Sequence, residues 1–99
     1  MFKLLMSWNI RPGYEEEFFE FYQREFGPKL AEIGVRISDA WVTYYGDYPQ
    51  FLTGGLANDL EGLKVTLSSD DWHKLKIKLL TYVVDYDQKI VRANGEFQL

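Results

Sequence analysis

The chain has 99 residues, 46% of them hydrophobic and 17% aromatic, and a formal net charge of −4 at pH 7. Residues 1–99 are therefore expected to form one domain with a sizeable core, and the acidic balance with scattered lysines argues against a protein that binds nucleic acid. The chain has no cysteine and no apolar run of the about 18 residues that a membrane helix needs, which excludes disulfide and thiolate sites and predicts a cytoplasmic protein that is not bound to a membrane.

Alternating apolar residues predict that residues 2–10 form the first strand. The side chains expected on one face of this strand are Phe2, Leu4, Met6, Trp8 and Ile10. A turn at Arg11-Pro12-Gly13 precedes a helix predicted over residues 14–26, where apolar residues recur at steps of three and four. Gly27-Pro28 should bend or restart this helix, because proline lacks the N–H, and Gly34 suits its C-terminal cap.

Two strands are predicted next, over residues 35–45 and 50–57, joined by turn residues at 46–49. Glycine inside a strand weakens it and often marks a bulge or a place where backbone or ligand comes close. Gly54-Gly55 therefore indicates such a feature in the third strand.

A short helix is predicted over residues 60–67, with Asn58-Asp59 as its cap. Ser69 then begins a longer helix whose apolar stripe includes Trp72, Leu75, Leu79, Tyr82, Val83 and Tyr86. The last strand is expected at about residues 88–93, followed by a turn at Asn94-Gly95 and a short pairing segment at residues 97–99.

The predicted order of elements is β-α-β-β-α-β, the ferredoxin-like arrangement, with a four-stranded antiparallel sheet and helices on one face. The second strand, however, carries large aromatic side chains on both faces, with Trp41 and Tyr45 on one side and Tyr44 on the other. A sheet with one wet face would alternate apolar with polar residues. We therefore expect two copies to stack their open faces as a homodimer, with an apolar interface of about 2,000 Å² or more.

Two segments carry a family resemblance: the first strand running into Arg11-Pro12-Gly13-Tyr14-Glu15, and the step from Asp59-Leu60-Glu61 to Ser69-Asp70-Asp71-Trp72. On these motifs, nearly the whole chain resembles the dimeric α+β barrel superfamily, which includes the antibiotic-biosynthesis monooxygenase, stress-responsive barrel and NIPSNAP-like families. The resemblance implies a dimer of ferredoxin-like subunits with a cavity between sheet and helices. It implies no single reaction, since members oxidise polyphenols without a cofactor, degrade haem or isomerise small substrates.

His73 is the only histidine, and the only side chain whose unperturbed pKa lies near neutrality. With the neighbouring Trp72 and with Asn9, near the end of the first strand, it forms a set of candidate catalytic residues: His73 as general base and Asn9 as partner for a substrate oxygen. Alternatively, His73 is a surface residue, and the Asn9 side chain satisfies hydrogen-bonding groups of the turn at Arg11-Pro12. Haem-degrading relatives use the same three residue types, but their tryptophan and histidine are well separated in sequence, whereas here they are adjacent.

The candidates for the lining of a ligand cavity are Trp8, Trp41, Tyr44, Tyr45 and Tyr82. Alternatively, these rings are core residues. The sequence contains no nucleotide-binding or metal-ligand motif, so no cofactor and no metal are expected. The leading hypothesis is a homodimer that binds a small apolar or aromatic molecule. A cofactor-independent monooxygenase or isomerase, and a structural or interaction module without a ligand, are the alternatives.

Overall fold

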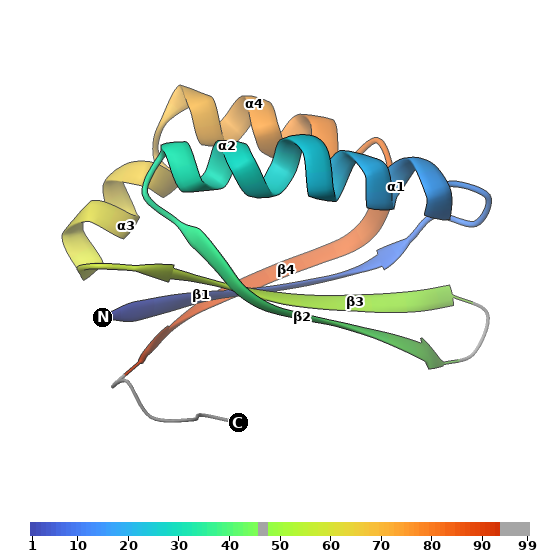
Figure 1. Ribbon diagram of the computed structural model, residues 1–99, viewed down its shortest axis with the longest axis horizontal. Coiled ribbons are helices and arrows are strands. Elements are labelled where there is room, and N and C mark those ends of the chain that lie inside the picture. The colour runs from blue at the N-terminus through green and yellow to red at the C-terminus, as the bar shows by residue number, and fades with distance from the viewer. Residues whose placement is uncertain (46–47, 94–99) are drawn as a thin grey trace.

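The computed structural model describes residues 1–45 and 48–93, and its elements follow the predicted order (Figure 1). They are β1 (Phe2–Ile10), α1 (Glu15–Phe21), a π-helical turn η1 (Tyr22–Phe26), α2 (Gly27–Glu32), β2 (Arg36–Tyr45), β3 (Tyr48–Ala57), α3 (Leu60–Leu67), α4 (Asp70–Leu79) and β4 (Val83–Arg92). Residues 46–47 of the predicted hairpin turn, the turn predicted at Asn94-Gly95 and the pairing predicted for residues 97–99 lie outside the described residues.

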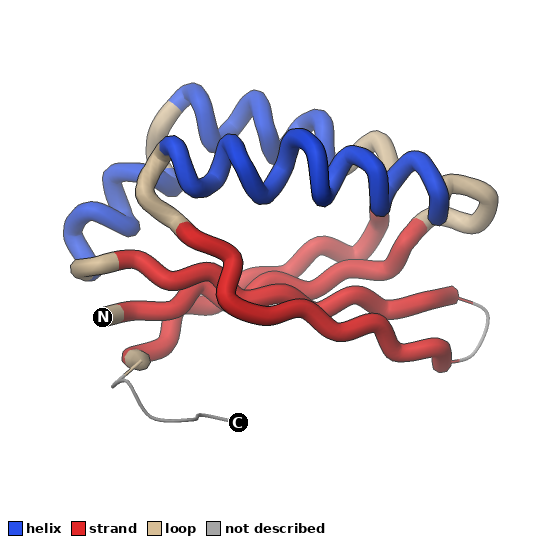
Figure 2. The backbone as a smooth tube through the Cα atoms, viewed as in Figure 1, coloured by secondary structure: helices blue, strands red, loops and turns tan. Residues whose placement is uncertain are grey.

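The four strands form one antiparallel sheet in the order β2-β3-β1-β4. The helices all lie on one face of this sheet, and the opposite face carries none of them (Figure 2). This is the ferredoxin-like α+β fold that the order of elements predicted. Over the described residues, none of the helices combines the length and the apolar character that a membrane crossing requires.

The core lies between the helices and the side of β1 that faces them. The alternate β1 residues Leu4, Met6, Trp8 and Ile10 are at most 1% exposed, which confirms the predicted alternation. The buried side chains that the helices add are Phe18, Phe21, Phe26, Leu30, Leu63, Trp72, Leu75 and Leu79. Much of the aromatic area of this small chain is therefore hidden in one layer between sheet and helices.

The helix caps follow the sequence closely. The Asp59 side chain accepts from the Gly62 N–H and begins α3, and the Ser69 hydroxyl accepts from the Trp72 N–H and begins α4. Gly34 has a φ of +100° just after α2, which is the left-handed conformation of a C-terminal cap.

The predicted interruption at Gly27-Pro28 is a π-helical turn inside one continuous helical segment. The Gly27 N–H donates to the Tyr22 carbonyl, five residues earlier, and α2 then begins with Pro28 in its first turn. In a regular α-helix, the proline ring would clash with the carbonyl of the residue four positions before it. A wider π turn is one of the usual ways in which a helix absorbs such a residue.

The predicted end of the last helix is wrong, because β4 begins at Val83 and not near residue 88. Tyr82, Val83 and Tyr86 continue the helical spacing of α4, but they lie beyond its end. Val83 pairs with Ile10 of β1, and the Tyr86 ring stacks on Trp8. The helical spacing does not decide the structure here. Val83 is β-branched, which favours a strand, and β1 offers a long strand for β4 to pair with.

The glycine pair of β3 lies beside the bulge that it predicted, although the extra residue, Ser38, belongs to β2. Gly54 also permits a close approach of side chains. A Cβ at Gly54 would lie 2.5 Å from both Asp39 Oδ1 and Lys3 Cε. The absence of a side chain there lets Lys3 Nζ reach Asp39 Oδ2 at 2.7 Å across the open face of the sheet.

Two tyrosines of the helix-covered layer predict a loss of stability in alkali. Burial raises the pKa of Tyr86, with the negative charge of Asp87 adding to it, and burial also raises the pKa of Tyr22. Above the ordinary tyrosine value of 10.0, the unfolded chain releases protons that the folded chain retains. We expect the contribution of these two tyrosines to the free energy of unfolding to be constant below that pH and to fall as the pH rises above it, measured by urea unfolding. Tyr86→Phe should weaken this fall, and an unchanged fall would contradict the assignment.

Candidate functional site

The space between sheet and helices is packed with aromatic rings, and two predicted site residues belong to this packing. Trp8 and Trp72 are 1% and 2% exposed. Tyr86 contacts both, with ring centroids 5.9 Å from Trp8 and 6.5 Å from Trp72, and Phe26 contacts both at 5.8 Å and 6.4 Å. The buried Nε1 of Trp8 has no hydrogen-bond partner among the described residues. A buried indole N–H usually finds one.

The structure does not bring the three predicted catalytic residues together. His73 is exposed on α4, in the helical layer, whereas its neighbour Trp72 points into the core. Asn9 follows Trp8 on β1 and therefore faces the other side of the sheet, where its Nδ2 donates to Asp85 Oδ2 at 3.0 Å. His73 and Asn9 thus lie on opposite sides of the sheet within one subunit.

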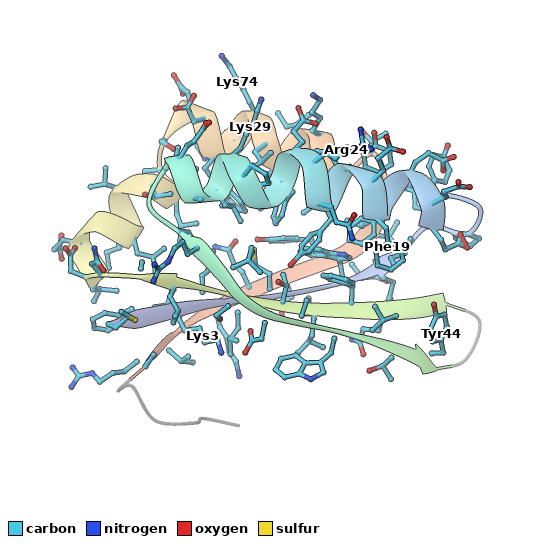
Figure 3. The ribbon with its side chains drawn as sticks, viewed as in Figure 1. Lys3, Phe19, Arg24, Lys29, Tyr44 and Lys74 are labelled. Carbon is cyan, nitrogen blue, oxygen red and sulfur yellow. The ribbon has the colours of Figure 1, made fainter. Side chains whose placement is uncertain are left out.

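The predicted aromatic residues are also divided between surfaces. Trp41 is 49% exposed on the open face, and Tyr44 is 78% exposed on the opposite face of the same strand, near the end of β2 (Figure 3). Tyr82 is half-buried near the start of β4, where its ring contacts Phe21 at 5.2 Å. The Tyr45 side chain lies outside the described residues. One enclosed cavity lined by all of these rings is therefore not formed within the subunit.

The open face of the sheet has an apolar centre. Trp41 pairs with Leu52, which is 36% exposed, and Leu5 lies beside them on β1. A depression of about 330 Å³ lies next to these side chains; it is lined by Leu5, Met6, Ser7, Gln50, Leu52, Asp87, Gln88 and Lys89. The Lys3–Asp39 ion pair lies on the same face, so two charges there already neutralise each other.

A second hollow, of about 410 Å³, lies where β1 ends and β4 begins; it is lined by Asn9, Arg11, Pro12, Tyr14, Val84 and Asp85. Asp85 has a φ of +57°, an uncommon value for a residue with a side chain. It occupies a bulge at which the register between β1 and β4 shifts, and this bulge places its carboxylate beside Asn9.

The sequence named Asn9 as a candidate site residue, but it gave no reason to consider Arg11 and Asp85, which line the same hollow. Arg11 was interpreted only as part of the turn after the first strand. The neighbourhood of Asn9 and Asp85, which are 76 positions apart, depends on the bulge in β4. No spacing in the sequence signals that bulge, because a helix was predicted over the same residues.

No family model matches the sequence, and no curated protein matches it. Solved structures match the fold over nearly the whole chain. An uncharacterised NIPSNAP domain protein from Burkholderia xenovorans is 14% identical and has a TM-score of 0.73, with 99% of each chain covered. A NIPSNAP family protein from Agrobacterium tumefaciens is 16% identical and has a TM-score of 0.72, with 95% of this chain and 93% of that chain covered.

An antibiotic biosynthesis monooxygenase of known structure is also similar, with 14% identity and a TM-score of 0.66 over 96% of this chain and 100% of that chain. Identities this low bear on the fold and leave the activity open. These structural matches agree with the resemblance that the sequence motifs indicated. The chain has the ferredoxin-like α+β fold of NIPSNAP domain proteins and antibiotic biosynthesis monooxygenases.

Proposed function

We propose that the protein works as a homodimer in which two copies stack the open faces of their sheets, and that this assembly binds a small molecule. The observation that carries the dimer is the apolar patch on a face that none of the described helices covers. Trp41 and Leu52 form a cross-strand pair there, and they are 49% and 36% exposed. Exposed apolar patches with polar surroundings mark interaction surfaces.

The shape of this face suits a second copy of the same face. The large Trp41 side chain projects beside a depression of about 330 Å³, which has room for an indole ring. In a two-fold dimer, each Trp41 can enter the depression of the other subunit, because the same pair of contacts occurs twice. The charges of Lys3 and Asp39 on this face already neutralise each other, and Asp87 and Lys89 at the depression supply one charge of each sign.

The size of the face is also sufficient. Four strands about 4.8 Å apart and about 30 Å long present about 600 Å² per subunit, before the roughness of the side chains is counted. Two such faces bury about 1,200 Å², which is the lower end of the range for stable interfaces and less than the area of about 2,000 Å² expected from the sequence.

Light scattering on the full chain at micromolar concentration tests the dimer. We expect twice the 11.7 kDa mass of one chain, and a mass that falls only on strong dilution. A single-chain mass throughout the micromolar range would contradict the proposal.

For the small molecule, we propose an approach at the edge formed by α1, η1 and β2, where the packed rings between sheet and helices would have to move apart to admit it. Val42 and Tyr44 are 36% and 78% exposed on the helix-facing side of β2, and Phe19 lies between α1 and the sheet (Figure 3). Behind this edge, the Tyr22 hydroxyl is bonded to Thr53 Oγ1 at 2.6 Å, and the Nε1 of Trp8 lacks a partner among the described residues. An apolar or aromatic molecule with one hydrogen-bond acceptor suits this combination.

Thermal melting against a panel of small aromatic compounds tests this binding. We expect the melting temperature to rise with ligand concentration for compounds that combine a ring with an acceptor. No shift across the panel would contradict ligand binding and leave an assembly module. Catalysis by His73 and Asn9 is a weaker alternative, because the two side chains lie on opposite sides of the sheet within one subunit.

A further inference from the structure

We propose that the hollow at the end of β1 is a binding site for a small aromatic carboxylate that carries a hydroxyl or amino group on its ring. The site goes beyond the entry at the β2 edge and uses different residues. The hollow has a volume of about 410 Å³, which is within the usual range for small-molecule sites. Pro12 and Tyr14 belong to the loop after β1, so this side of the hollow lies outside the sheet face on which the subunits are proposed to meet.

The hollow offers a carboxylate acceptor in a fixed place. Asn9 Nδ2 donates to Oδ2 of Asp85 at 3.0 Å, and Oδ1 accepts no hydrogen bond from the described residues. The carboxylate is held there by a bulge in which Asp85 takes a φ of +57°. Glycine would adopt this conformation without steric cost, so the side chain is kept at a position that the backbone alone would not favour. A free carboxylate oxygen can accept from a ligand hydroxyl or amino group.

The hollow also offers a positive charge. Among the residues that the structure describes, the guanidinium of Arg11 makes one hydrogen bond, from Nη2 to the Leu80 carbonyl at 3.3 Å. Among the described residues, no carboxylate lies within ion-pair distance of Arg11, and this includes the carboxylate of Asp85. Arginine retains further N–H donors in a planar fork, which matches a carboxylate.

The remaining lining residues favour a ligand with a flat apolar ring between its carboxylate and its hydrogen-bond donor. Tyr14 is 43% exposed, and Pro12 and Val84 complete the apolar part of the lining. A ligand with a carboxylate for Arg11, a ring for Tyr14 and a donor for Asp85 satisfies all three at once. A plain fatty acid lacks the donor, and a plain phenol lacks the negative charge.

The probe is 4-hydroxybenzoate, titrated into the full chain at neutral pH and followed by calorimetry or by amide chemical shifts. We expect saturable binding that is at least tenfold tighter than the binding of benzoate or of phenol. Arg11→Gln and Asp85→Asn should each weaken it at least tenfold. The matched controls Arg24→Gln and Glu61→Gln change the same charges at exposed positions elsewhere and should leave it unchanged.

Asp85→Gly separates binding from structure. Because glycine adopts a φ of +57° readily, this variant should stay folded and melt close to the parent temperature, and yet lose the binding. Circular dichroism shows whether each variant is folded. The proposal is overturned if 4-hydroxybenzoate binds no tighter than benzoate and phenol, or if the Arg11 and Asp85 variants bind it as well as the controls do. Asn9 and Asp85 lie on the open face of the sheet, so the titration is repeated on the Trp41→Asp variant to separate this binding from dimer formation. The site uses no residue of the β2 edge.

Discussion

Trp41→Asp is expected to convert the dimer into a monomer at micromolar concentration. The substitution removes a large ring from the proposed interface and puts a charge in its place, and tryptophans buried at interfaces commonly contribute about 2 kcal/mol or more to binding. The two-fold axis doubles the effect to about 4 kcal/mol per dimer, which corresponds to a dissociation constant about 1,000-fold higher. Sedimentation over a concentration series measures the change.

Tyr44→Asp is the matched control for this substitution. Tyr44 lies on the same strand and is more exposed than Trp41, at 78% against 49%, but it faces the side on which the helices lie. The same charge is therefore introduced three residues away on the other face of the sheet, where it should leave the mass unchanged. A dimer that survives Trp41→Asp, or that dissociates equally with Tyr44→Asp, would show that the subunits do not meet through the open face.

The fold was largely predictable because its local signals and its packing agree. The alternation in β1 survives in the burial of Leu4, Met6 and Trp8, and the caps at Asp59 and Ser69 begin helices where their side chains accept backbone N–H groups. The prediction failed where the same spacing of apolar residues fits both a helix and a strand. Residues after Thr81 fit the stripe of α4, but their pairing with β1 is a long-range contact that no local window contains.

The candidate sites were harder to predict, because they depend on which face a residue occupies and on register. Asn9 and Trp8 are neighbours in sequence, yet one faces the open side and the other the core. His73 has the chemistry of a general base, but α4 turns it away from the core that Trp72 enters. The partner of Asn9, Asp85, comes from a bulge for which the sequence offers no marker.

Trp8→Ala is expected to lower the free energy of unfolding by about 3–5 kcal/mol, the usual cost of emptying a buried tryptophan site. The Trp8 ring is 1% exposed and contacts the rings of Phe18, Phe26, Phe51 and Tyr86. Urea unfolding measures the loss, best in the Trp41→Asp background, where dissociation of a dimer does not add to the unfolding transition. Ile77→Ala, at an apolar position that is 70% exposed on α4, should cost less than about 0.5 kcal/mol.

Trp8→Phe distinguishes the volume of the indole from its N–H group. Phenylalanine leaves a smaller cavity than alanine and removes an N–H whose burial without a partner costs about 1–3 kcal/mol. In the unliganded chain, Trp8→Phe should therefore cost much less than Trp8→Ala. If a ligand with an acceptor enters at the β2 edge, the same variant should lose most of the ligand-induced rise in melting temperature while keeping nearly all of its own stability. Equal costs for the two variants would indicate that Nε1 already has a partner, and the ligand would then need no acceptor for it.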